Sequence, residues 1–237
     1  MKKISFQNRI WELDFARGVA IVIVVLVHLT RFLIKYTSLG LSWPEPIYYF
    51  KQYAGFFFVL LSGICIAFSK NSFKRGLIVF GCGLIITAWT SIVYYVAGDH
   101  ELIRWGVLHL IGFCMMLYPL IKKLPQPVIL VLAIALIIAG YYVKFECWTL
   151  NPYLFPLGIK RLDFHDADCF PIIPHLGWFM LGVWLKPRIY KEKKTLFPNV
   201  DSSRGFISAF CWLGRHSIWI YMIHLPLFYI IIRYCIK

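Results

Sequence analysis

The stretch FARGVAIVIVVLVHLTRFLIKY, residues 15–36, decides the fold class of this chain. It is long enough to cross the hydrocarbon core of a bilayer as a helix, which takes about 20 mainly apolar residues. Six further apolar runs cover about residues 47–69, 76–97, 106–121, 125–144, 171–186 and 216–235. We therefore predict an all-α fold: a polytopic membrane helix bundle of about seven transmembrane helices.

The composition supports a membrane protein rather than a soluble one. Of the 237 residues, 60% are hydrophobic and only 15% are charged, whereas soluble domains carry about 25% charged residues. The net charge of +14 does not indicate nucleic-acid binding, because the cations form short clusters between apolar runs instead of one basic face. The length suits a single transmembrane domain over residues 1–237.

Lysine and arginine predict the orientation, because they favour cytoplasmic loops. With seven spans, most of them fall on one side: Lys2, Lys3, Arg9, Lys70, Lys74, Arg75, Lys122, Lys123, Lys186, Arg188, Lys191, Lys193, Lys194 and Arg204. The N-terminus is then cytoplasmic and the C-terminus outside, and the multi-pass chain is expected in the cell membrane. Cys147 and Cys169 are the cysteines expected in an outer loop, where a disulfide and two free thiols are both possible.

Ionisable residues within a span are costly, so each is a candidate functional residue. Arg17 and His28 are eleven residues apart, about three helical turns with ~20° of residual rotation, so both face one stripe of the first span. Asp14 lies one turn before Arg17 on nearly the same stripe. This pattern indicates that the stripe faces the bundle interior or a polar cavity. The alternative is an interfacial ion pair between Asp14 and Arg17, with His28 as a hydrogen-bonded core residue.

Three more histidines, His109, His175 and His224, fall within later spans and suggest a polar chamber that opens outward. Taken singly, each is more often a helix–helix hydrogen bond. No pair of them has the i,i+3 or i,i+4 spacing of a zinc site, so no metal is expected. Cations at the cytoplasmic ends of spans include Arg17, Lys70, Lys74, Arg75 and Arg215. These either follow the topology rule and contact lipid phosphates, or bind the phosphates of a nucleotide-containing carrier.

The chain carries, in order, the motifs Arg9-Ile-Trp-Glu-Leu-Asp14-Phe-Ala-Arg17-Gly18 through His28, Phe58-Val-Leu-Leu-Ser62-Gly63, Ser72-Phe-Lys-Arg75-Gly76, Gly106-Val-Leu-His109-Leu-Ile-Gly112, Asp168-Cys-Phe-Pro171-Ile-Ile-Pro174 through Gly177, and Leu213-Gly214-Arg215-His216-Ser217 through Tyr221 and His224. With these motifs the chain resembles, nearly from end to end, the heparan-α-glucosaminide N-acetyltransferase catalytic-domain family in its short bacterial form. The spacing from Arg17 to His28 is also similar to that of bacterial membrane acyltransferases that modify surface polysaccharides. The eukaryotic enzymes place their catalytic histidine in the first outer loop, where this chain has none, so His28 is the expected substitute.

The resemblance implies that an acetyl or other acyl group passes from cytoplasmic acyl-CoA to an amine or hydroxyl of a sugar or glycan on the outer side. His28 is then the general base, and Asp14 fixes Arg17 or helps to bind the donor. We expect the cofactor-binding residues, which hold the phosphates of acetyl-CoA, to be Arg17, Lys74, Arg75 and Arg215. We expect the chamber to be lined by His109, Asp168, His175 and His224. The alternative is a small non-enzymatic transporter or flippase with a polar path, and a homo-oligomer is left open.

Overall fold

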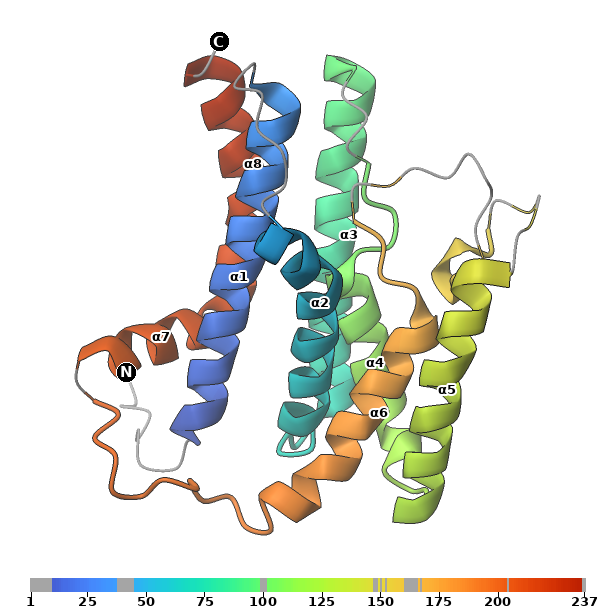
Figure 1. The fold of residues 1–237 in the computed structure, drawn as a ribbon, viewed down its shortest axis with the longest axis vertical. Helices are drawn as coiled ribbons and strands as arrows, with labels where there is room; N and C mark the ends of the chain where they lie inside the picture. The colour runs from blue at the N-terminus through green and yellow to red at the C-terminus, as the bar shows by residue number, and fades with distance from the viewer. Residues whose placement is uncertain are drawn as a thin grey trace. The chain divides into compact units, whose positions relative to one another are not determined.

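The computed structural model of the protein describes residues 10–37, 45–98, 102–146, 153–159, 168–203 and 205–235, together with residues 149, 151 and 166. Within these residues the regular elements are helices, joined by loops and one isolated bridge between Trp105 and Cys169 (Figure 1). The helices are α1 (Trp11–Tyr36), α2 (Glu45–Ile66), α3 (Ser72–Ala97), α4 (Val107–Ile121), α5 (Gln126–Glu146), the short 3₁₀ helix η2 (Phe155–Leu157), α6 (Ile172–Ile189), α7 (Gly205–Arg215) and α8 (Ser217–Cys235).

The all-α membrane fold is confirmed. Among the described residues, three helices are long and apolar enough to cross a bilayer: Trp11–Tyr36, Ser72–Val96 and Gln126–Val143. Shorter apolar helices cover Gly55–Ile66, Val107–Ile121 and Ser217–Ile231. Each predicted span coincides with a helix to within a few residues. The count of seven crossings and the cytoplasmic N-terminus stay predictions.

Helix α7 lies between two predicted spans, in a segment for which no helix is predicted. Its 11 residues give a helix about 16 Å long, too short to cross a hydrocarbon core of about 30 Å. Phe206 and Trp212 are exposed on α7, whereas Cys211 and Gly214 are buried. An apolar helix of this length is suited to the membrane interface, where one face meets lipid and the other meets protein.

The chain divides into two compact units. The first consists of residues 1–58 and 190–237 and contains α1, α7 and α8. The second consists of residues 59–189 and contains α3 to α6 with the end of α2. The single transmembrane domain expected over residues 1–237 remains a prediction.

In the first unit, two glycines let α1 and α7 pack backbone against backbone. A Cβ atom at Gly18 would overlap the carbonyl oxygen of Phe210, and one at Gly214 would overlap the carbonyl oxygen of Asp14. Small residues at such crossings are typical of helix packing in membranes, where close van der Waals contact holds helices together. Farther along, α8 runs beside α1 (Figure 1).

In the second unit, glycines likewise allow close backbone contact between helices. A Cβ atom at Gly76 of α3 would lie 2.7 Å from the carbonyl oxygen of Gly112 on α4, and one at Gly177 of α6 would lie 2.6 Å from that of Ala133 on α5. Gly182 of α6 likewise fits against the end of α2. The helices that carry the remaining candidate residues are therefore held at short interaxial distance.

Candidate functional site

The contact between His28 and His224 is the centre of the candidate site. His28 lies on α1 and His224 on α8, and their ring centroids are 5.0 Å apart with the planes inclined at 60°. His224 is buried, whereas His28 is half-buried. The structure thus brings together two imidazoles that lie near opposite ends of the chain.

The orientation of the His224 ring is fixed by its own helix. Its Nδ1 lies 2.6 Å from the carbonyl oxygen of Tyr221. A carbonyl oxygen only accepts hydrogen bonds, so Nδ1 carries the proton, and in the neutral ring Nε2 is the acceptor. The rings of Tyr221 and Phe228 pack edge-on against His224, with centroids 5.0 Å and 5.8 Å away. An imidazole oriented through a backbone carbonyl is a common arrangement in sites that transfer protons or bind metals.

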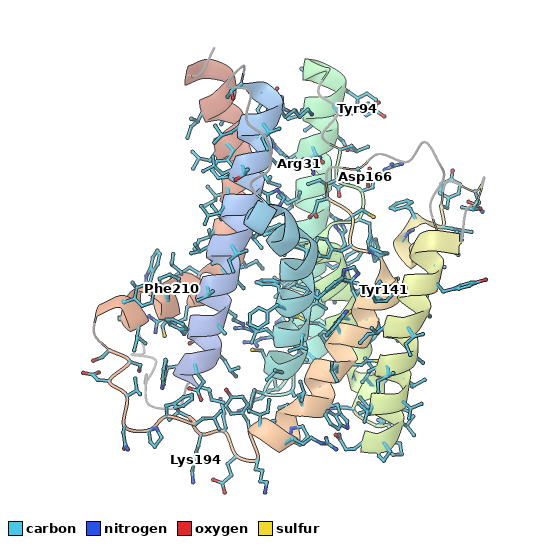
Figure 2. The ribbon with its side chains drawn as sticks, viewed as in Figure 1. Arg31, Tyr94, Tyr141, Asp166, Lys194 and Phe210 are labelled. Atoms are coloured by element: carbon cyan, nitrogen blue, oxygen red, sulfur yellow. The ribbon has the colours of Figure 1, made fainter. Side chains whose placement is uncertain are left out.

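On α1, the described helix supports the predicted stripe from Arg17 to His28. The helix is continuous from Trp11 to Tyr36, so the two residues are separated by about 16 Å along the axis and ~20° around it. Arg31, which is not among the predicted site residues, lies one turn beyond His28 and within ~60° of it on α1 (Figure 2). Arg31 is half-buried. A search for every charged residue within a span would have found it.

Asp14 and Arg215 each lie near Cys211 of α7. Asp14 is buried, and its backbone carbonyl meets Gly214 directly before Arg215. Burial raises the pKa of the Cys211 thiol; the Asp14 carboxylate raises it further, whereas the Arg215 guanidinium lowers it. Cys211 also donates to the carbonyl oxygen of Trp11 at 3.4 Å. The first unit therefore carries two predicted site residues at the crossing of α1 and α7, the acidic Asp14 and the basic Arg215.

In the second unit, Lys74 and Arg75 are exposed in the first turn of α3. The side chain of Asn71 caps this helix by accepting a hydrogen bond from the Lys74 amide at 2.9 Å. Thr87 is 13 residues farther along α3, which is about 20 Å. The two cations and the residues around Thr87 therefore lie at well-separated levels of the unit.

His109 lies beside Thr87, and both of its ring nitrogens have hydrogen-bonding partners. Its Nδ1 accepts from the Gly106 amide at 3.2 Å, and its Nε2 lies 3.3 Å from Oγ1 of Thr87. Thr87 donates its own proton to the carbonyl oxygen of Ile103 at 2.8 Å, so Nε2 of His109 must be the donor to Thr87. The ring stacks on Trp105 at 5.7 Å. This geometry joins the start of α4 to α3, and a role in binding the acceptor stays a prediction.

Asp168 approaches the start of α4, where a carboxylate is favourable next to the helix N-terminus. Its Oδ2 would lie 3.2 Å from a Cβ atom at Gly106. The two loops are joined by an isolated bridge between Trp105 and Cys169, by the Phe170 amide donating to the Trp105 carbonyl at 3.1 Å, and by an ion pair at 2.9 Å between Arg104 and Asp166, whose carboxylate is fully buried.

His175 lies in the first turn of α6, just after this pair of loops. It is buried, and its Nδ1 donates to the carbonyl oxygen of Pro171 at 2.7 Å. The ring of Phe170 is 5.1 Å away. His109, Asp168 and His175 thus belong to the second unit, and their role in lining a chamber stays a prediction.

The predicted residues thus form two groups. The first unit carries Asp14, Arg17, His28, Arg215 and His224, and the second carries Lys74, Arg75, His109, Asp168 and His175. Within the described residues, no three His, Cys, Asp or Glu side chains gather as a metal-binding group. Cys147 lies outside the residues that the structure describes, so its pairing with Cys169 stays a prediction.

Residues 9–226 match the family model described as heparan-alpha-glucosaminide N-acetyltransferase, catalytic. No curated protein and no solved structure matches the chain. The matched range contains both groups of candidate residues, from Asp14 to His224.

Proposed function

Because this chain belongs to the heparan-alpha-glucosaminide N-acetyltransferase catalytic family, a family of transmembrane acetyltransferases, we propose that it transfers an acetyl or other acyl group from cytoplasmic acyl-CoA to a sugar on the outer side. The acceptor group is an amine or a hydroxyl. The proposal includes seven membrane crossings, with α7 at the cytoplasmic interface, the N-terminus inside and the C-terminus outside. The membrane concerned is the cell membrane.

The observation that carries the proposal is the contact of His28 with His224. His28 lies on the same stripe of α1 as Arg17. A bound donor with its phosphates near Arg17 extends its pantetheine arm along α1 toward the histidines. The ~16 Å between Arg17 and His28 is of the order of the length of that arm. This supports a donor site that begins at the cytoplasmic end of α1 and a reaction centre near His28.

In the proposed reaction, His28 takes a proton from the acceptor hydroxyl or amine as that group attacks the thioester carbonyl. The carbon–sulfur bond then breaks, and the proton returns from His28 to the departing thiolate. His224, held by the Tyr221 carbonyl, packs against His28 and restricts its ring orientation. Asp14 orients the cationic groups near the donor. His109, Asp168 and His175 of the second unit stay predicted chamber residues.

The proposed function is tested with purified protein in lipid nanodiscs. Acetyl-CoA is supplied with a panel of amino sugars and glycans, and both released thiol and acetylated product are measured. Thiol release coupled to one acceptor is the expected result. If no donor is bound or consumed, and proteoliposomes instead move a sugar across the membrane, the chain is a transporter or flippase.

The proposed topology is tested separately with reporter fusions. A reporter placed after residue 237 is expected to lie outside the cytoplasm, and one inserted in the loop before α7, residues 191–203, is expected inside. If both lie on the same side, the number of crossings between them is even, and α7 and α8, the helices between the two reporters, are the first to be re-examined.

A further inference from the structure

The segment that joins α6 to α7, residues 190–203 and here called the strap, is bound to the start of α1. In Figure 1 it passes the N-terminal end of α1 before α7 begins. Glu12 makes the attachment: its Oε2 accepts from the Thr195 hydroxyl at 2.8 Å and its Oε1 accepts from the Leu196 amide at 2.7 Å. Both carboxylate oxygens are therefore used to hold a segment more than 180 residues away in sequence.

The conformation of the strap on either side of this attachment is also specified. The Phe197 amide donates to the Thr195 hydroxyl at 3.2 Å, and the Phe197 ring packs against Trp11 with centroids 6.2 Å apart. The Val200 amide donates to the Phe197 carbonyl oxygen at 3.3 Å. The strap is thus a folded element with a defined path past α1.

The strap carries a cluster of cations directly before the attachment point. Lys191, Lys193 and Lys194 are exposed, and Lys194 adjoins the residue that Glu12 binds. Lys194 forms an ion pair with Glu192 at 2.6 Å. The two side chains are 80% and 69% exposed, respectively, so the pair adds little stability. Figure 2 shows Lys194 on the strap, outside the helices. The first part of the strap is therefore a positively charged surface fixed in place by Glu12.

This surface is attached near the start of α1, where the proposed donor site begins. Glu12 precedes Arg17 by five residues, about 7.5 Å along the helix axis and ~140° around it, so a donor that reaches both must extend around the start of α1. Coenzyme A carries phosphate at two places, the diphosphate and the 3′-phosphate, so several cations can share its charge, and the strap lysines would add to Arg17 and the other predicted donor residues. Lysine is a common ligand of phosphate as a compact point charge.

We propose that Lys191, Lys193 and Lys194 bind the nucleotide phosphates of the acyl-CoA donor, and that Glu12 is the positioning residue that holds them beside the start of α1. This inference rests on the proposed function. Lipid headgroups offer the same phosphate chemistry at the cytoplasmic interface, so the experiment must distinguish the two sources.

The experiment measures kcat and KM for acetyl-CoA in nanodiscs of phosphatidylcholine, with and without phosphatidylglycerol. The variant Lys191→Gln/Lys193→Gln/Lys194→Gln is expected to raise KM about tenfold in both lipids, the loss typical of a charge-assisted hydrogen bond, with kcat within about twofold of the wild type. The matched control is Lys122→Gln/Lys123→Gln, in the exposed turn after α4, which is expected to leave KM unchanged.

The role of Glu12 is tested with two substitutions. Glu12→Ala removes both hydrogen bonds and is expected to raise the KM for acetyl-CoA, as the triple lysine variant does. Glu12→Gln keeps them, because its amide oxygen accepts from the Leu196 amide and its NH₂ group donates to the Thr195 hydroxyl, so KM is expected to stay near the wild-type value. If Glu12→Ala does not fold, Glu12→Gln and the exposed lysine variant still provide the test.

Three results overturn the inference. The first is an unchanged KM in the triple lysine variant, and the second is a change seen only with phosphatidylglycerol, which assigns the lysines to lipid headgroups. The third is an unchanged KM in a folded Glu12→Ala variant, which removes the positioning role. A wild-type protein that neither binds nor consumes acetyl-CoA refutes the proposed function itself, and this outcome is distinct from the other three.

Discussion

Replacement of His28 by asparagine tests the proposed chemistry most directly. Asparagine keeps a hydrogen-bonding group but does not accept a proton at neutral pH. The change removes the ring contact with His224 at 5.0 Å, whereas the contact between Phe32 and Phe228 one turn farther, at 6.0 Å, is retained. The α1–α8 pair is therefore expected to stay assembled in the His28→Asn variant.

The expected losses in stability and in rate differ enough to be separated. An aromatic ring contact contributes about 0.5–1.5 kcal/mol, which a folded membrane protein tolerates. A positioned general base contributes about 10²–10⁴-fold in rate, or about 3–5 kcal/mol of transition-state stabilisation. The kcat of His28→Asn for acetyl transfer is therefore expected to fall by at least about 100-fold, while the affinity for acetyl-CoA and the thermal midpoint change little.

The assay follows acetylated product by mass spectrometry in nanodiscs, with donor binding measured by calorimetry on the same preparation. His216→Asn is the matched control, because His216 lies in the turn between α7 and α8, with its Nδ1 2.9 Å from the carbonyl oxygen of Trp212. Near-normal kcat in His28→Asn would refute the reasoning. The base would then have to be sought among His109, His175 and His224.

Three further predictions concern donor binding, helix packing and cysteine pairing. Arg17→Ala is expected to weaken acetyl-CoA binding by about tenfold or more in a folded protein, measured by calorimetry; unchanged affinity would favour a purely interfacial ion pair. Gly214→Ala places a methyl group on a carbonyl oxygen of α1 and is expected to lower stability by about 1–3 kcal/mol in thermal unfolding, whereas Gly81→Ala, with no atom within 4 Å of its Cβ position, is not. If Cys147 and Cys169 form a disulfide, thiol labelling of intact cells requires reductant, and full labelling without it excludes the bridge.

Much of the fold follows from local sequence because a transmembrane helix is a local structure. All of its backbone hydrogen bonds are internal, so a sufficiently long apolar run determines a helix without reference to the rest of the chain. The run at residues 15–36 therefore predicted α1, and its helical period predicted that Arg17 and His28 share a face. Helix α7 escaped this reasoning because 11 residues are fewer than a span requires, and its helix is stabilised by packing on α1.

What the tertiary structure alone decided is which faces meet. Hydropathy identifies α1 and α8 separately, but it does not say that His28 contacts His224 or that Glu12 holds Thr195. Those contacts depend on how the elements pack: α1 and α7 meet backbone to backbone at Gly18, and α1 and α8 meet through the ring pairs His28–His224 and Phe32–Phe228. The sequence by itself determined the class of protein, its helices and a stripe of ionisable residues. Only the folded chain decided which of those residues are neighbours, because packing between distant segments is a property of pairs of surfaces and not of any single window of sequence.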